Sequence, residues 1–227
     1  MKIIGFGDIH MATATAADIP GITSADLVLL TGDLTNFGSA EDAKIVLEDV
    51  LKLNPRVLAQ YGNLDNRGIN DYLEQLGLNM HGQARVCKGE VCIIGVGGSN
   101  YTPFHTPSEF SEKDLFHVAD RAFQQGLEYS AMARKLHNRS IPLLFVSHVP
   151  PVDTKVDRLW NGKHVGSTAI RTIIEKYQPD LCITGHIHEG KGTDTILQTP
   201  ICNPGMLRNG GWVTVTIENS KLEIQLQ

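Results

Sequence analysis

The chain has 227 residues, of which 41% are hydrophobic and 20% charged, close to an average globular protein and long enough for one large α/β domain. Its formal net charge of −5 gives no long-range attraction for nucleic acid or anionic membranes, so neither is an expected partner. No apolar run reaches the roughly 18 residues of a membrane-spanning helix. A small anionic substrate is still compatible with this net charge, because bound cations would cancel the negative charge of the protein locally.

Six apolar runs predict β-strands, and each leads into glycine, serine or other small polar residues. They cover residues 2–6, 26–30, 56–59, 91–96, 142–146 and 180–183. The runs are continuous rather than alternating, which is typical of strands that are buried on both faces. The first run begins near the first residue, so we expect no signal peptide before it.

Three segments between these runs predict helices, at residues 39–54, 111–138 and 167–177. Ser39 begins a capping sequence, and Pro55 and Pro179 follow the ends of the first and third segments. The tail changes to alternation over residues 212–217 and 222–226, with Asn219-Ser220 between them as a hairpin turn. The alternation of strands and helices predicts the α/β class.

No repeat, low-complexity tract or linker interrupts the chain, so we expect a single domain over residues 1–227. Within it, residues 107–139 form a helical insertion. It is best explained as an ordinary covering helix, but it could also serve as a lid or as a dimer face, which would make the protein a homodimer.

The four cysteines lack the spacing of a metal finger. Cys92 and Cys182 lie inside apolar runs, which indicates buried, unreactive thiols. A core of this size needs no disulfide framework, so a cytoplasmic location is expected.

Metal-binding side chains gather where the predicted strands end. They are Asp8, His10, Asp33, Asn63, His148, His186 and His188. Ligands collect outside the carboxyl ends of strands in α/β folds, so we expect these side chains at one edge. Two carboxylates, one amide and four imidazoles are more than one ion needs and about what two adjacent ions would share.

Each of these residues has an ordinary structural explanation when taken singly. Asp33 could cap a turn, Asn63 could occupy a left-handed turn, and His148 could be a loop histidine. It is improbable that five strand ends would all carry possible metal ligands by chance. The metal-binding interpretation is therefore preferred.

The ordered motifs resemble the calcineurin-like metallophosphoesterase family. They are Asp8-Ile9-His10, Gly32-Asp33, Gly62-Asn63, His148 and Gly185-His186-Ile187-His188. The resemblance implies a two-sheet β-sandwich flanked by helices, in four α/β/β/α layers, with two divalent ions at one edge. It assigns one ion to Asp8, His10 and His188, the second to Asn63, His148 and His186, and the bridge between them to Asp33.

The resemblance also implies a hydrolase of phosphate esters, a phosphodiesterase or a phosphatase, in which a metal-bridging hydroxide attacks phosphorus. Asn63 and His148 would then face the charge that develops there, so both are predicted catalytic residues. Nitrogen and oxygen donors without thiolate favour Mn²⁺, with Fe or Zn²⁺ as alternatives. The expected substrate is a small soluble phosphate ester.

Leu64 departs from the pattern, because many family members carry histidine directly after the Gly-Asn pair. The chain resembles the subgroup with Gly-Asn-x-Asp, in which Asp65 is expected to support the turn. A leaving-group acid must then come from elsewhere. His164, in the polar loop after His148, is the first candidate catalytic residue, and His105 is the second.

Two other functions compete with the hydrolase. The retromer scaffold subunit resembles this family and keeps much of the ligand set, so a metal-binding scaffold with weak or no catalysis is one alternative. A nuclease is the other, and it is less favoured because the chain is acidic and lacks a basic stretch with interleaved aromatic residues. All seven donor positions keep their donor atoms, which favours the enzyme.

Overall fold

The computed structural model describes residues 1–227, except for the side chain of His137. One sheet consists, in spatial order, of β13 (Lys221–Leu226), β12 (Val213–Glu218), β1 (Lys2–Phe6), β2 (Leu27–Leu30) and β3 (Val57–Ala59). The other consists of β10 (Gly192–Ile196), β11 (Thr199–Asn203), β9 (Leu181–Ile183), β8 (Leu143–Ser147), β5 (Val91–Val96) and β4 (Gln83–Cys87). Two short parallel strands, β6 (Ser99–Asn100) and β7 (Glu109–Phe110), form a separate two-stranded sheet.

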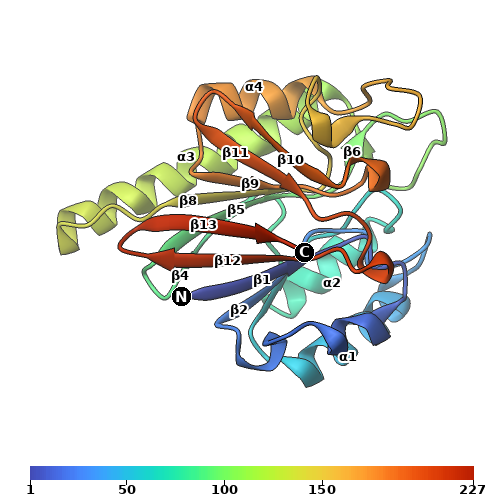
Figure 1. The fold of residues 1–227 in the computed structure, drawn as a ribbon, viewed down its shortest axis with the longest axis horizontal. Helices are drawn as coiled ribbons and strands as arrows, with labels where there is room; N and C mark the ends of the chain where they lie inside the picture. Colours follow the sequence, from blue (N-terminus) through green and yellow to red (C-terminus); the bar gives the residue numbers. More distant parts are fainter.

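The helices are α1 (Ala40–Leu53), α2 (Gly68–Gln75), α3 (Glu112–His137) and α4 (Thr168–Tyr177). Short 3₁₀ turns are η1 (Thr13–Asp18), η2 (Ile22–Ser24), η3 (Lys155–Asp157), η4 (His188–Gly190) and η5 (Leu207–Asn209). The two sheets stack face to face, with α1 and α2 outside the first and α3 and α4 outside the second (Figure 1). The predicted α/β fold, a two-sheet sandwich flanked by helices in four layers, is confirmed.

Three apolar layers explain why the strand sequences are continuous. Ile3 of β1 packs between the two sheets, whereas its neighbour Ile4 packs beneath the helices that cover the first sheet. On the second sheet, Ile93 likewise faces the inter-sheet layer and Ile94 faces α3 and α4. Successive side chains of a strand point to opposite faces, so a strand covered on both sides must be apolar at every position.

Strand direction brings the site together. β1 pairs in parallel with β2 and β2 with β3, while β5, β8 and β9 run parallel in the second sheet. The loops that follow these strands gather at one edge of the sandwich, on the right in Figure 1. This carboxyl edge holds the candidate site.

Helix α3 covers the second sheet with its N-terminal half, where Leu115, Ala119 and Phe123 are buried. In its C-terminal half, Met132 and Leu136 are exposed. The single domain stays a prediction. So do the possible roles of this helix as a lid or as a dimer face. Within the part of the chain that the structure describes, no helix combines the length and apolar composition needed to cross a membrane.

Candidate metal centre

The seven predicted donors lie together at the carboxyl edge. Two groups of three have donor atoms within 4.8 Å of one another: Asp8, His10 and His188 form one, and Asp33, His148 and His186 form the other. Asn63 joins the second group, because its Oδ1 lies 3.1 Å from Nε2 of His148. The grouping matches the two predicted ligand sets, while metal binding by them stays a prediction.

Asp33 lies between the two groups. Its Oδ2 is 4.0 Å from Nε2 of His10 in the first group, and its Oδ1 is 3.5 Å from Nε2 of His148 in the second. The same carboxylate therefore faces both sets of imidazoles, as a bridging ligand must. Oδ1 also accepts a hydrogen bond of 2.9 Å from the backbone N–H of Leu64, which holds the carboxylate in place.

The backbone at this edge is strained. Asp8, His10, Asp33 and His186 all have left-handed backbones, with φ of 48°, 49°, 49° and 65°. Such conformations are uncommon outside glycine and persist only where the surrounding structure imposes them. Four of the seven donors share this feature, so the loops are shaped to aim side chains at a common point.

Two glycines are needed because the donors come so close to the backbone. A Cβ atom on Gly62 would lie 2.1 Å from Oδ1 of Asp33, and a Cβ on Gly185 would lie 2.6 Å from Oδ2 of Asp8. Both distances are far below van der Waals contact. The Gly-Asn and Gly-His motifs thus have a steric reason here.

Hydrogen bonds fix the direction of the His148 ring. Its Nδ1–H donates to the carbonyl oxygen of Thr31 over 3.1 Å, so in the neutral ring Nε2 is the nitrogen with a lone pair. That lone pair faces Oδ1 of Asn63. Two acceptors at 3.1 Å repel each other unless a proton or a cation lies between them.

Thr106 and Glu109 fix the direction of the Asn63 amide. Glu109 Oε1 can only accept, so the hydroxyl of Thr106 donates to it over 2.7 Å. The Thr106 oxygen then accepts from Nδ2 of Asn63 over 3.0 Å, and Oδ1 of Asn63 must point the other way, toward His148. Sequence analysis missed both Thr106 and Glu109, since neither follows an apolar run.

The first group shows a similar crowding of lone pairs. Nε2 of His10 lies 3.3 Å from Nε2 of His188, which in turn lies 3.2 Å from Oδ1 of Asp8. Among the described residues, Nδ1 of His10 is buried without a hydrogen-bond partner. Imidazole nitrogens and carboxylate oxygens crowded in this way fit the needs of a divalent cation.

Electrostatics at the second group favour positive charge. Burial lowers the pKa of His148, but the carboxylates of Asp33, Asp8 and Asp65 together raise it to about 9, with Asp33 contributing most of the three. Burial would raise the pKa of Asp33, and the charge on His148 holds it below its ordinary value. Burial and the His148 charge lower the pKa of His186 to about 4. The negative charge of Asp33 is thus balanced by a proton here, which a metal ion could replace.

Asp65 supports the turn, as expected. Its carboxylate is fully buried and accepts from the backbone N–H groups of Leu34, Thr35 and Gly62, at 2.8 to 2.9 Å, and from the Thr35 hydroxyl at 2.7 Å. These contacts tie the loop after β2 to the loop after β3. They thereby hold Asp33 and Asn63 side by side.

A cavity of about 810 Å³ opens over the donors and includes Asp33, Asn63, His186 and His188 in its lining. His148 is fully buried and is not among the described residues that line it. His164 does line the cavity, whereas His105 is exposed and lies outside the described lining.

Buried Asp157 holds the His164 ring. The Nδ1–H of His164 donates to Oδ1 of Asp157 over 2.6 Å, and Asp157 also accepts from the backbone of Thr154 and Gly166. Nε2 of His164 accepts from Nε of Arg158 over 3.2 Å. This His-Asp pair gives His164 a defined orientation at the cavity wall.

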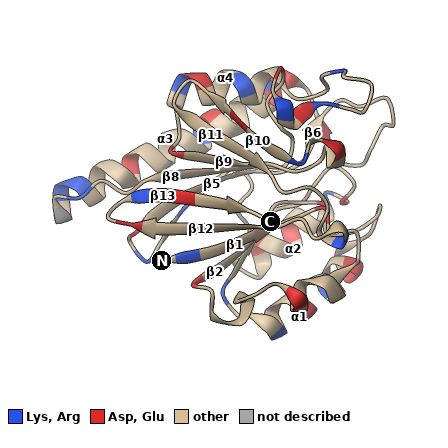
Figure 2. Ribbon diagram, in the orientation of Figure 1, with Lys and Arg blue, Asp and Glu red and all other residues tan. Residues whose placement is uncertain are grey.

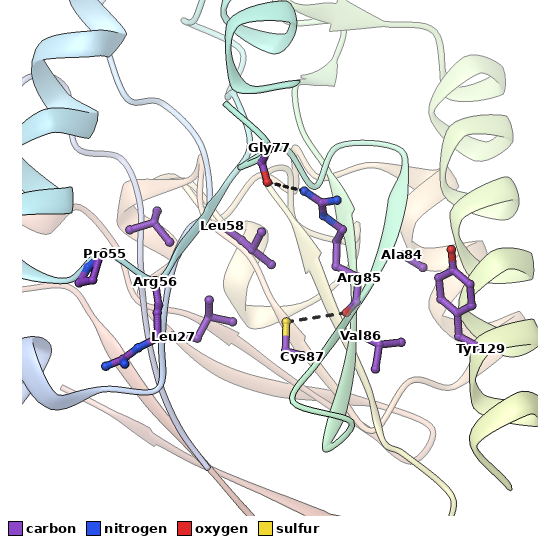
Figure 3. Close-up of a pocket in the computed structure, with 11 residues that line it drawn as sticks. Leu27, Pro55, Arg56, Leu58, Gly77, Ala84, Arg85, Val86, Cys87 and Tyr129 are labelled. Atoms are coloured by element: carbon purple, nitrogen blue, oxygen red, sulfur yellow. Dashed lines mark hydrogen bonds between the residues drawn. The ribbon is translucent and has the colours of Figure 1, made fainter. Parts of the chain in front are cut away.

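A second hollow of about 660 Å³ lies at the amino ends of β2 and β3, beside β4 (Figure 3). Arg56 donates to the carbonyl of Ala25 over 2.9 Å, and Arg85 donates to the carbonyl of Gly77 over 2.5 Å. Each guanidinium group thus has one N–H held by a backbone carbonyl. None of the predicted site residues is among the described residues that line this hollow.

Comparisons with known proteins agree with the fold and the motifs. A family model described as calcineurin-like phosphoesterase matches residues 1–190. The uncharacterized protein MJ1162 of Methanocaldococcus jannaschii is 32% identical over 210 residues, which are 90% of this chain and 88% of that protein.

Solved structures show the same fold at low sequence identity. TT1561 of Thermus thermophilus superimposes with a TM-score of 0.69 at 18% identity, covering 99% of this chain and 98% of that one. A dimetal phosphatase from Danio rerio gives 0.63 at 11% identity, covering 99% and 95%. The family match spans most of the chain and includes every predicted donor, so this protein belongs to the calcineurin-like phosphoesterase family.

Proposed function

We propose that the protein hydrolyses a small phosphate ester, a monoester or a diester, with two divalent metal ions held by the seven donors. The observation that carries this proposal is Asp33, whose two carboxylate oxygens face imidazoles of two separate donor groups. A site for one ion would not need the second group. The name of the dimetal phosphatase neighbour is consistent with the proposal.

The donor chemistry supports Mn²⁺ first, with Fe or Zn²⁺ as alternatives, because imidazole nitrogens are mixed with carboxylate and amide oxygens. Asp8, His10 and His188 would hold one ion, Asn63, His148 and His186 the other, and Asp33 both. When bound, such a pair would lower the pKa of a water molecule, making it a nucleophile for phosphorus, and would neutralise phosphoryl charge.

The protein's own side chains would orient the phosphate ester and assist its hydrolysis. Asn63 lines the cavity with one amide hydrogen held by Thr106, which leaves the second hydrogen for a phosphoryl oxygen. His148 is fully buried, so we assign it to holding an ion rather than to direct contact with substrate. His164 is the proposed leaving-group acid: Arg158 must first turn away from Nε2, and Nε2 must then carry the proton that the leaving group takes, while Asp157 keeps its hydrogen bond to Nδ1–H.

The nuclease alternative gains no support from the distribution of charge. Basic residues are interspersed with acidic ones along α1, α3 and α4 (Figure 2). Only one lysine, Lys163, is among the described residues that line the cavity, together with the acidic Glu189. A small substrate suits this cavity better than a polyanionic strand.

The test is a metal-reconstitution assay. Protein stripped with a chelator is loaded with Mn²⁺, Fe²⁺, Zn²⁺ or Mg²⁺ and assayed on p-nitrophenyl phosphate and bis(p-nitrophenyl) phosphate. We expect Mn²⁺ to restore turnover, and Asp33→Ala to lower kcat/KM at least about 100-fold. Asp71→Ala, which removes an exposed carboxylate on α2, is the matched control and should retain activity.

The proposal fails if correctly folded protein, as judged by circular dichroism, turns over neither ester with any of these metals. It also fails if Asp33→Ala and Asp71→Ala behave alike.

A further inference from the structure

The cavity over the donors has an aromatic wall, defined here as Phe37, Tyr101 and Phe104. These three side chains line the same cavity as Asp33 and the site histidines. They are 59%, 69% and 80% exposed, respectively. Soluble proteins seldom gather large exposed apolar side chains without a use for them, so a cluster at the mouth of a polar site needs an explanation.

The loop that carries Tyr101 and Phe104 is held firmly. Glu109 Oε1 accepts from the hydroxyl of Thr102 over 2.6 Å and from the backbone N–H of Thr106 over 2.9 Å. The Thr102 oxygen in turn accepts from the backbone N–H of Phe104 over 3.1 Å. The exposed rings are therefore displayed by a hydrogen-bonded loop around a carboxylate that is itself largely buried.

Phe37 reaches the cavity from the opposite sheet. Its φ of 55° is left-handed, which is an outlier for a bulky aromatic residue and carries a cost in strain. It follows Asp33 in the loop that Asp65 ties down. Strained backbone and an exposed ring are both unfavourable for the free protein, so a bound group that covers the ring would offset part of that cost.

The remaining lining indicates what kind of group this is. Leu64, Leu159 and Val165 add apolar surface, and the charged side chains are few. Aromatic rings offer flat contact area with only two side-chain torsions to fix, and they stack on planar partners. The volume of about 810 Å³ lies in the range of cavities that hold small organic ligands.

We propose that the aromatic wall binds a planar aromatic or heteroaromatic group on the alcohol side of the phosphate ester. This inference rests on the proposed phosphoesterase function, because the phosphate end is placed at the donors. A flexible alkyl chain or a saturated ring would fill the same space but would not stack, and the test separates these cases.

The test compares benzyl and cyclohexylmethyl phosphates, as monoesters and as methyl diesters, on the Mn²⁺-loaded protein. Cyclohexyl is the more hydrophobic group, so a merely apolar wall would favour it, whereas stacking favours benzyl. We expect kcat/KM to be about threefold to tenfold higher for the benzyl ester, the range that aromatic pairs contribute. Octyl phosphate tests the alkyl chain, and a preference for it would overturn the proposal.

The variants Phe104→Leu and Tyr101→Leu keep apolar bulk and remove the ring. They should lower the ratio of benzyl to cyclohexylmethyl kcat/KM by about threefold to tenfold relative to the unaltered protein, a comparison in which the difference in leaving-group acidity cancels. Trp160→Leu is the matched control, because Trp160 is 88% exposed but is not among the described residues that line the cavity. Its ratio should equal that of the unaltered protein. An unchanged ratio in Phe104→Leu and Tyr101→Leu would overturn the proposal.

A binding measurement separates this inference from the proposed function. Calorimetric titration with benzylphosphonate and cyclohexylmethylphosphonate, which contain no ester bond, needs no turnover. Tighter binding of the benzyl compound by a protein that hydrolyses neither ester would support the aromatic-wall proposal and refute the proposed phosphoesterase function. Hydrolysis of both esters at equal rates, with equal affinities for the two phosphonates, would refute the aromatic-wall proposal and leave the proposed phosphoesterase function intact.

Discussion

Asn63 depends on residues far away in the sequence. Its Nδ2 is held by Thr106, 43 positions along the chain, and Thr106 is held by the carboxylate of Glu109. Groups that orient metal ligands in this way commonly affect metal affinity about 10- to 100-fold when they are lost. The Glu109-Thr106 pair is therefore expected to matter for the metal centre without belonging to it.

The variant Thr106→Val should weaken Mn²⁺ binding about tenfold or more, because the amide of Asn63 loses the acceptor that keeps its oxygen toward His148. Thr102→Val is the control, since Thr102 also donates to Glu109, whereas the hydrogen bond that holds the Asn63 amide goes to Thr106. Isothermal titration of both variants with Mn²⁺ gives the comparison. Equal affinities would contradict the orienting role.

His164 can be tested by the choice of leaving group. A p-nitrophenolate leaves without a proton, whereas an alkoxide needs one. His164→Gln should thus lower kcat/KM for an alkyl phosphate by about 100-fold and for a p-nitrophenyl phosphate by only a few-fold. The two rates are measured on the same Mn²⁺-loaded preparation. Equal losses on both substrates would show that His164 is not the acid.

At the scale of elements, α3 and α4 are joined at their N-termini. Glu112, the first residue of α3, accepts from the Ser167 hydroxyl over 2.6 Å and from the backbone N–H groups of Thr168 and Ala169 over 3.2 and 2.8 Å. A carboxylate at this position satisfies free N–H groups and complements the helix dipole. The contact anchors α4, and with it the end of the loop that carries His164.

The variant Glu112→Ala should lower the free energy of unfolding by about 1 to 2 kcal/mol, through loss of these charge-assisted hydrogen bonds. Glu128→Ala removes an exposed carboxylate from the same helix and should change it by less than about 0.5 kcal/mol. Urea denaturation of metal-free protein measures both. A similar effect of the two substitutions would argue against the capping role.

The elements that sequence analysis predicted are those whose own residues carry a strong signal. β1 and β8 are apolar because both faces are covered, α1 has its capping box at Ser39, and the turn at Asn219 and Ser220 has the left-handed φ values that such a hairpin requires. The seven donors were predictable for the same reason, since they follow such strands.

The elements that were missed lack that signal. β4 and β10 are edge strands with only part of their surface buried, and α2 begins at Gly68 without a side-chain cap. Glu109 and Thr106 were missed because their roles arise from contacts across the fold. Local patterns can predict which residues end a strand, but they carry no information about which loops meet.

At the scale of the whole molecule, the chain crosses from the first sheet to the second through His81. Its Nδ1 accepts from the backbone N–H of Gly97 over 2.9 Å, and its Nε2 lies 3.2 Å from the hydroxyl of Tyr61. Burial lowers the pKa of His81 to about 4. A protonated ring would lose the bond from Gly97, because Nδ1 could no longer accept.

This histidine should make the stability of the whole fold depend on pH. The unfolded chain binds a proton on His81 below about pH 6.5 and the folded chain only below about 4, so stability is lost as the pH falls through that window. The loss attributable to His81 is about 3 kcal/mol. Between about pH 7 and 4.5, unfolding free energies of His81→Gln should fall less steeply than those of the unaltered protein. If the unfolding free energies of both proteins fall equally steeply with pH, His81 is not the source of the pH dependence.

The central claim is that two sheets bring two donor groups together around Asp33 to hold a pair of ions. Diffraction from crystals soaked in Mn²⁺, recorded at a wavelength where manganese scatters anomalously, tests it directly. The claim predicts two anomalous peaks about 3.5 to 4 Å apart, one beside Asp8, His10 and His188 and the other beside Asn63, His148 and His186, with Asp33 between them. A single peak, or peaks away from these side chains, would contradict it.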